Sequence, residues 1–126
     1  MITLQSYLSG SWQTGTGTPA QLFNPTTEEA IAECSSEGLD MAAAVTYGRE
    51  VGGAALRAMT FSERGQLLKA LAAAIHEYRE ELIALAIQNG GNTRGDAKFD
   101  IDGASATLAA YAHFSKELPD AKFLTD

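Results

Sequence analysis

The sequence contains one cysteine, three prolines and only nine lysine and arginine residues among its 126 residues. The single cysteine, Cys34, excludes a disulfide within the chain and is typical of a reducing compartment. The 16 acidic residues bring the net charge to −7, and the basic residues do not cluster. Because nucleic-acid affinity depends on lysine and arginine, we expect no nucleic-acid partner.

A long apolar run is also missing. No segment approaches the ~18–20 apolar residues that span a bilayer. The first residues have neither the basic start nor the apolar centre of a signal peptide. We therefore expect no membrane partner and a cytoplasmic location. The length suits one small domain, and an apolar content of 45% is enough to form a core.

Residues 1–34 have the turn-rich, extended pattern of short strands. Asparagine and proline at positions 24 and 25 favour a tight turn, because proline presets φ and asparagine suits the first position. The pattern predicts a small antiparallel sheet that includes a hairpin. The predicted segments are a strand-turn-strand at 7–12, a loop at 14–19, a strand at 20–23, a turn at 24–27 and a strand at 30–34.

Residues 35–118 show the period of helices. A first helix is expected over residues 35–51, with Ser36 as its cap and Gly52-Gly53 as its end. The chain as a whole is thus predicted to be α+β, with a small sheet followed by about four helices. A tail at residues 119–126 carries no packing signal.

The longest helical signal runs from Thr60 to Asn89. Thr60 and Glu63 have the spacing of a capping box, a bend is expected near residues 76–78, and Gly90-Gly91 ends the run. A last helix follows and closes before Pro119. Leu71→Ala should cost about 2–5 kcal/mol if the apolar stripe of the long segment is buried. That stripe comprises Leu67, Leu68, Leu71, Ile75, Tyr78, Leu82 and Leu85.

One segment matches a dinucleotide-binding pattern by its letters alone. Residues 15–20 read G-x-G-x-x-A, and Asp40 follows about 20 residues later. In that motif the last position opens a helix whose N-terminus holds a pyrophosphate. Here Pro25 follows Ala20 closely and the flanks read as strands. We interpret the segment as a hairpin loop.

The remaining reactive side chains form no catalytic group. Cys34 is surrounded by glutamates, which disfavour a thiolate, so we expect a small buried side chain. His76 and His113 stand far apart in helical patterns and are expected to be partly exposed. No catalytic, cofactor-binding or metal-binding residue is predicted in this chain. The acidic residues Asp96, Asp100 and Asp102 favour stabilisation of a helix N-terminus over a cation site.

Four motifs, in the order in which they occur, resemble the N-terminal part of the aldehyde dehydrogenase superfamily. Together they span residues 7–118, which makes the set specific although each motif is weak alone. The motifs are Y-L-S-G-S-W at 7–12, F-N-P-T-T-E-E-A-I at 23–31, F-S-E-R-G-Q-L-L at 61–68 and Y-R-E-E-L at 78–82.

Further segments resemble a narrower subgroup, which oxidises CoA-thioester semialdehydes with NADP⁺ in phenylacetate and benzoyl-CoA degradation. These segments are 36–44, 55–61, 89–94, 100–103 and 117–120. The resemblance implies an α/β parent enzyme, of which residues 1–126 form an incomplete N-terminal part. The family's cysteine nucleophile, glutamate base and dinucleotide-binding segment would lie beyond the matched region. Relatives are usually dimers or tetramers.

The resemblance also implies one functional surface. The last helix borders the substrate tunnel in relatives, and Phe99 and Gly103 fall at the tunnel-facing positions, one helical turn apart. The alternative is that Phe99 belongs to the core. Gln88 stands where many relatives carry an acidic residue near a structural cation, which argues against such a cation here. A second hypothesis is a stand-alone helical interaction protein that kept the scaffold without the chemistry.

Overall fold

The computed structural model describes residues 1–125, and its N-terminal third forms two small sheets. One sheet has the order β1-β5-β4 and the other is the hairpin β2-β3. The predicted segments at 7–12, 20–23 and 30–34 are all confirmed as strands. The strands are β1 (Ile2–Thr3), β2 (Ser6–Leu8), β3 (Ser11–Gln13), β4 (Ala20–Phe23) and β5 (Ala30–Cys34).

The prediction of a purely antiparallel sheet was wrong for the first strand. β4 and β5 are antiparallel, but β1 pairs with β5 in parallel, with Ile2 opposite Ala32. The N–H of Leu4 continues this ladder by donating to the carbonyl of Glu33 at 2.8 Å. Turn residues predict pairing only between neighbours in sequence, whereas a parallel pair needs a long crossover that leaves no local signal.

The two tight turns each contain a non-glycine residue with positive φ. Ser9 (φ 51°) and Gly10 (φ 86°) connect β2 and β3, which is the two-residue hairpin geometry that matches strand twist. In the second turn, Asn24 Oδ1 accepts hydrogen bonds from the N–H groups of Thr26 and Thr27 at 2.9 and 3.3 Å. Glu28 there has a φ of 61°, a left-handed conformation that disfavours side chains with a Cβ.

The helices follow the predicted order but not all the predicted bounds. The first begins later than expected, because Asp40 rather than Ser36 is its cap and accepts from the N–H of Ala43 at 2.8 Å. It also continues past Gly52-Gly53, both of which have right-handed φ; a glycine ends a helix when it turns left-handed. The helices are α1 (Met41–Tyr47), the π-turn η1 (Gly48–Gly52), α2 (Gly53–Ala58), α3 (Phe61–Glu77), α4 (Arg79–Gly90) and α5 (Arg94–Phe114).

The long helical segment has the predicted ends and bend. The N–H of Glu63 donates to Thr60 Oγ1 at 3.3 Å, and the N–H of Thr60 donates to Glu63 Oε2 at 2.7 Å. This reciprocal pair is the capping box. The bend lies at Tyr78, between α3 and α4, and Gly91 closes α4 with a φ of 67°.

The last helix ends at Phe114, and the chain then folds back over the start of α3. Ala121 accepts a hydrogen bond from the N–H of Phe61 at 2.8 Å, and Lys122 accepts one from Arg64 at 2.9 Å. The prediction of helix as far as residue 118 was wrong by four residues, and the tail contacts α3 although it carries no packing signal in the sequence. Both contacts use backbone carbonyls, which carry no side-chain pattern. Asp126 lies outside the described residues.

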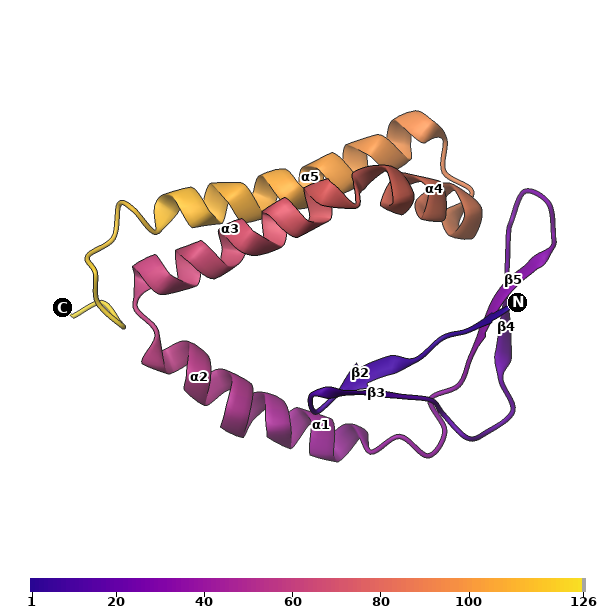
Figure 1. Ribbon diagram of the computed structural model, residues 1–126, viewed down its shortest axis with the longest axis horizontal. Coiled ribbons are helices and arrows are strands. Elements are labelled where there is room, and N and C mark those ends of the chain that lie inside the picture. Colours follow the sequence, from indigo (N-terminus) through magenta and orange to yellow (C-terminus); the bar gives the residue numbers. More distant parts are fainter. Residues whose placement is uncertain (126) are drawn as a thin grey trace.

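Figure 1 shows these elements arranged as an open frame. The helices α3 and α5 lie side by side along one edge, and the α1–η1–α2 rod with the β2–β3 hairpin forms the opposite edge. Gly65 on α3 is buried against the end of α5. Its missing side chain permits the close approach, because a Cβ at this position would lie 2.6 Å from the Cβ of Ser115. The buried hydrophobic residues within 1–125 are Ala32, Ala72, Ile83, Ala97 and Ala112.

The frame exposes far more surface than a compact protein of this size. Its accessible area is 9010 Å², whereas a compact monomer of this length exposes roughly 6,500 Å². The predicted leucine stripe accounts for part of the excess, because Leu67, Leu71 and Leu85 are 42%, 48% and 57% exposed. The face of α3 that packs on α5 is instead the one that carries Gly65 and Ala72.

Candidate functional site

An exposed face of α5 carries Phe99 and Gly103, the two residues that the sequence analysis identifies as tunnel-facing. The side chain of Phe99 is 80% exposed. No atom lies within 4 Å of the position that a Cβ of Gly103 would take. The helix is buried along a different stripe, through Ala97 and Ala112. Within the described residues Phe99 therefore belongs to no core, and Phe99 and Gly103 form an open surface on one side of the helix.

An arginine fork fixes this helix against α4. Arg79 Nε donates to Asp102 Oδ1 at 2.6 Å, and Arg79 Nη2 donates to Asp102 Oδ2 at 2.8 Å. This bidentate geometry restrains both the position and the rotation of the carboxylate. The hydrogen bond from Arg79 holds the pKa of the Asp102 carboxyl below its ordinary value. Asp102 directly precedes Gly103, so the pair restrains α5 beside that glycine.

The same network continues to the start of α5. Arg79 also contacts Glu80, and Glu80 Oε2 accepts from Arg94 Nη2 at 2.6 Å. The hydrogen bond from Arg94 is the main reason that the pKa of Glu80 is lowered. The sequence analysis missed this network, although Arg79 and Glu80 lie in the Y-R-E-E-L motif. The spacing of residues within α4 cannot predict this network, because the partners Asp102 and Arg94 belong to α5.

The three aspartates at the start of α5 do not form one acidic cluster. The N–H of Asp96 donates to Thr93 Oγ1 at 3.2 Å, which places its charge in the first turn of the helix. Asp102 pairs with Arg79, and Asp100 accepts from Asn92 at 3.5 Å. The preferred interpretation, helix N-terminal stabilisation, is confirmed for Asp96. No group of three potential metal ligands occurs in residues 1–125.

A second arginine joins the rod to the helix pair. Arg64 Nη1 donates to the carbonyls of Leu56 and Met59, both at 3.0 Å, and its guanidinium carbon lies 4.6 Å from the ring centre of Phe61. Together with its bond to Lys122, these contacts hold three chain segments at one corner of the frame. The two charged residues of the third motif thus have separate structural roles. Glu63 caps α3, and Arg64 holds the end of α2 and the C-terminal segment against α3.

The glycine-rich loop is not the predicted hairpin loop, because it joins β3 to β4, which belong to different sheets and do not pair. Its last residue, Ala20, opens β4 and no helix, so nothing there can hold a pyrophosphate on a helix N-terminus. The N–H of Thr16 donates to the carbonyl of Glu37 at 2.9 Å. Gly15 is needed for close approach, because a Cβ there would lie 2.2 Å from the carbonyl oxygen of Ser35.

The cysteine and the histidines are single side chains without a catalytic partner within residues 1–125. Cys34 is half-buried, not buried as predicted; it ends β5, the central strand of the three-stranded sheet. His76 is exposed, as expected. His113 is exposed as well, with its Nε2 3.9 Å from a carboxylate oxygen of Glu117. In the part of the chain that the structure covers, no helix is long and apolar enough to cross a membrane.

The order of strands and helices, the capped long segment and the open face of α5 agree with the four motifs noted in the sequence. Residues 12–125 match the aldehyde dehydrogenase family, and the chain belongs to that family. It is 41% identical over 125 residues to 3,4-dehydroadipyl-CoA semialdehyde dehydrogenase of Aromatoleum evansii. That similarity covers 99% of this chain and 24% of the relative, so the chain spans about a quarter of its length.

A solved structure shows the same arrangement. The crystal structure of an NAD-dependent benzaldehyde dehydrogenase from Corynebacterium glutamicum superposes with a TM-score of 0.81 at 25% identity, over 89% of this chain and 25% of that chain. The predicted resemblance to the aldehyde dehydrogenases and to a CoA-semialdehyde dehydrogenase is confirmed. The resemblance to the enzyme of phenylacetate degradation stays a prediction.

Proposed function

We propose that this chain is the N-terminal scaffold of an NADP-dependent aldehyde dehydrogenase that oxidises a CoA-thioester semialdehyde to its acid in the degradation of aromatic compounds. The support is the 41% identity, over nearly the whole chain, to a relative named for such a substrate. Residues 1–126 would form part of one larger α/β domain, incomplete as a catalytic unit. We expect a cytoplasmic enzyme that assembles as a homodimer or homotetramer.

The observation that carries a direct role for this segment is Gly103. A glycine inside a helix destabilises it by roughly 0.5–1 kcal/mol relative to alanine. Gly65 has a local reason, its close approach to Ser115, whereas no atom of the described residues comes within 4 Å of the Cβ position of Gly103, as is also the case at Gly48 and Gly52. With the exposed ring of Phe99 one turn away, this face suits the wall of a substrate tunnel that is completed by the rest of the enzyme.

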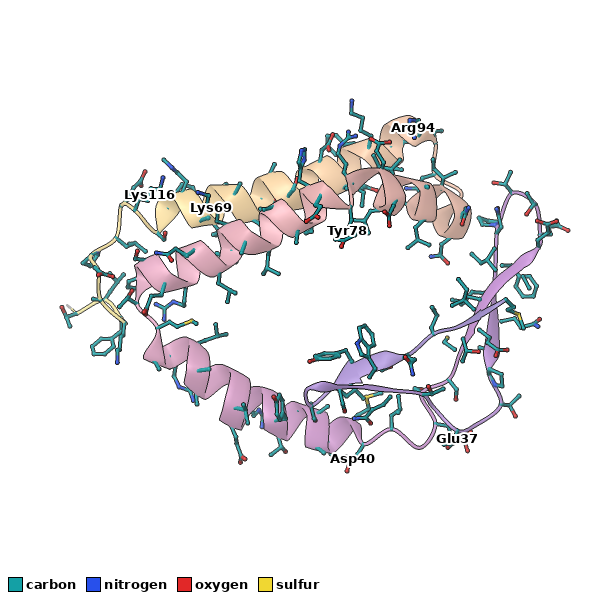
Figure 2. All side chains as sticks on the ribbon, viewed as in Figure 1. Glu37, Asp40, Lys69, Tyr78, Arg94 and Lys116 are labelled. Carbon is teal, nitrogen blue, oxygen red and sulfur yellow. The ribbon has the colours of Figure 1, made fainter. Side chains whose placement is uncertain are left out.

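The uncovered apolar surface supports a scaffold role. Leu71, Tyr78 and Leu85 are about half exposed, and Figure 2 shows Tyr78 on the side of the helices that faces the rod. Exposed apolar surface of this extent marks an interface. We assign it to the remainder of the longer chain. The alternative, a stand-alone interaction protein, also needs a partner for this surface. A well-behaved monomer of residues 1–126 in size-exclusion with light scattering, with a cooperative melt, would argue against both.

The residues of this chain do not fit the cofactor. No glycine-rich turn among residues 1–125 leads from a strand into a helix N-terminus, as a dinucleotide pyrophosphate requires. The hydride acceptor, the nucleophile and the base would therefore all come from the rest of the enzyme. We predict that residues 1–126 alone neither oxidise an aldehyde nor bind NADP⁺. Tight NADP⁺ binding in a titration would contradict this prediction and would indicate that residues 15–20 bind the dinucleotide after all.

The decisive experiment is turnover of a CoA-thioester semialdehyde by the full-length enzyme, with NADP⁺ and NAD⁺ compared. Gly103→Leu should then lower kcat/KM for the CoA substrate by about tenfold or more, because the leucine side chain fills space that a bulky substrate needs. A small aldehyde should be affected much less. Gly48→Ala is the control, since this glycine also has open space around its Cβ position but lies on α1–α2, away from the proposed tunnel. Equal losses for both aldehydes would contradict a tunnel wall.

A further inference from the structure

A groove lies between α3 and the end of α5. Its volume is about 360 Å³, within the range of small-molecule sites. Residues from both helices and from the turn after α5 line it, among them Ser62, Gln66, Lys69, Ala109, His113 and Lys116. None of the catalytic or tunnel roles proposed above uses these side chains.

The groove is hollow because its floor lacks large side chains. Gly65 is buried there and touches Ser115, and Ala109 and Ala112 contribute only methyl groups. The rim carries long polar side chains instead. A small floor with a polar rim leaves room for a ligand group and places donors around it. The hydroxyl of Ser115 is already used, because it donates to the carbonyl of Ala112 at 2.8 Å.

The rim is cationic in an acidic protein. Lys69 comes from α3 and Lys116 from the turn after α5, and Figure 2 shows both at the same end of the helix pair. Within residues 1–125 no carboxylate lies within 4 Å of either ammonium group, whereas Arg79 and Arg94 both have acidic partners. At the rim, His113 Nε2 lies 3.9 Å from a carboxylate oxygen of Glu117. Two unpaired lysines at one groove favour an anionic ligand.

We propose that this groove binds phosphate groups of the nucleotide tail of the CoA substrate, an inference that rests on the proposed function. Ten residues separate Gly103 from His113, which is roughly 15 Å along a helix. A ligand that contacts both places needs a long arm between its reacting group and its phosphates. A CoA thioester has that form, because the pantetheine arm separates the acyl group from the diphosphate and the 3′-phosphate. Lysine ammonium groups bind phosphate as point charges.

The test compares two substrates in the full-length enzyme. One is the CoA semialdehyde, and the other is the same semialdehyde as a thioester of N-acetylcysteamine, which carries no phosphate. The paired substitution Lys69→Ala with Lys116→Ala should raise KM for the CoA substrate by about tenfold or more, since each removes a charge-assisted contact. The KM for the truncated thioester should not change. Raising the ionic strength should weaken only the CoA substrate's binding.

Matched variants separate charge from folding. Lys69→Arg with Lys116→Arg keeps both charges and should restore most of the affinity, and Lys122→Ala removes a lysine outside the groove and should have no effect. If the paired substitution raises KM for NADP⁺ and leaves KM for the CoA substrate unchanged, the phosphate belongs to the cofactor and the proposal is overturned. Equal changes for both thioesters overturn it as well.

The proposed function and the groove can fail separately. If the enzyme does not oxidise the CoA semialdehyde, the proposed function is wrong, and binding of CoA itself is then measured by calorimetry. CoA binding that weakens about tenfold in the paired alanine variant, and that inorganic diphosphate competes away, supports the groove without the activity. Absence of CoA binding, or binding that is indifferent to both lysines, overturns the groove.

Discussion

The α3–α5 helix pair and the α1–η1–α2 rod are both rich in alanine and glycine, yet only the pair is packed. Gly65, Ala72, Ile83, Ala97 and Ala112 are buried in α3, α4 and α5. The rod contains no buried residue at all between positions 41 and 58. Small residues thus serve opposite purposes in the two regions: they bring two helices together in one and leave a bare surface in the other.

The difference shows that small residues allow close packing only where a partner helix is present. In the pair, Gly65 faces Ser115 at a distance that no larger residue permits. In the rod, Gly48 and Gly52 have no atom within 4 Å of their Cβ positions. We infer that the rod and the apolar side of α3 and α4 are interfaces for the rest of the enzyme. The following predictions test that comparison.

The largest effect is expected at Ile83, the one large side chain among residues 1–125 that is fully buried. Ile83 is 0% exposed, and Leu85 on the same helix is 57% exposed. Ile83→Ala should lower the free energy of unfolding of residues 1–126 by about 2–5 kcal/mol, whereas Leu85→Ala should cost under about 1 kcal/mol. Urea unfolding of both variants measures this. In the full-length enzyme the cost of Leu85→Ala should rise towards that of Ile83→Ala, and an unchanged cost would contradict the proposed cover.

Glycine substitutions should have opposite signs in the two regions. Gly65→Ala would place a Cβ 1.9 Å from Ser115 Oγ, and overpacking of this kind costs about 1–3 kcal/mol. Gly48→Ala meets open space and should stabilise the helix by roughly 0.5–1 kcal/mol. Thermal unfolding of each variant decides the sign. Adding Ser115→Gly to the Gly65→Ala variant removes the side chain that the new Cβ meets and should restore part of the lost stability. No restoration would contradict the close contact between Gly65 and Ser115.

The corner that joins the two regions depends on the fork of Arg64. Arg64→Lys keeps the charge but cannot donate to the carbonyls of Leu56, Met59 and Lys122 together. We expect a loss of about 1–2 kcal/mol, since each lost hydrogen bond is worth roughly 1 kcal/mol and one contact remains. Hydrogen exchange should show faster exchange at residues 56–61 than in the parent chain. Uniform exchange across the chain would contradict a local joint.

A smaller, pH-dependent effect is expected at Arg79–Asp102, which lies nearer the surface. Because the pKa of Asp102 is lowered by Arg79, the pair stabilises the fold above the unfolded pKa of about 3.9. That contribution is lost as the pH falls through the lower folded pKa. Asp102→Asn should therefore unfold more readily than the parent at neutral pH, with a difference that shrinks as the pH falls below the unfolded pKa of Asp102. A difference independent of pH would point to packing instead.

Much of the fold could be predicted where the signal is local. Thr60 and Glu63 stand three residues apart, and their capping box forms as expected. Asn24 and Pro25 make the predicted turn, and Gly91 adopts the left-handed conformation that ends α4. Each of these features is decided by side chains and backbone within a few residues, so the sequence alone contains the reason for it.

The failures concern partners from distant segments. The parallel pairing of β1 with β5, the fold of residues 121 and 122 over α3 and the fork between Arg79 and Asp102 all join residues far apart in the chain. The leucine stripe is covered only in part, with Leu68, Ile75 and Leu82 half-buried and the others exposed. Periodicity identified its residues, but only packing shows that α5 covers the face with Gly65 and Ala72 and not the face with Leu71.

The sequence by itself therefore determined the class of the protein, the order of its strands and helices and the position of Phe99 and Gly103 one turn apart. Caps, turns and periodicity are local, and the four motifs keep their order along the chain. Only the tertiary structure decided which surfaces are covered, because burial depends on which segments meet. In the tertiary structure Phe99 is exposed and belongs to no core of residues 1–125, and the solvent-accessible area is 9010 Å². Lys69 and Lys116 line the same groove.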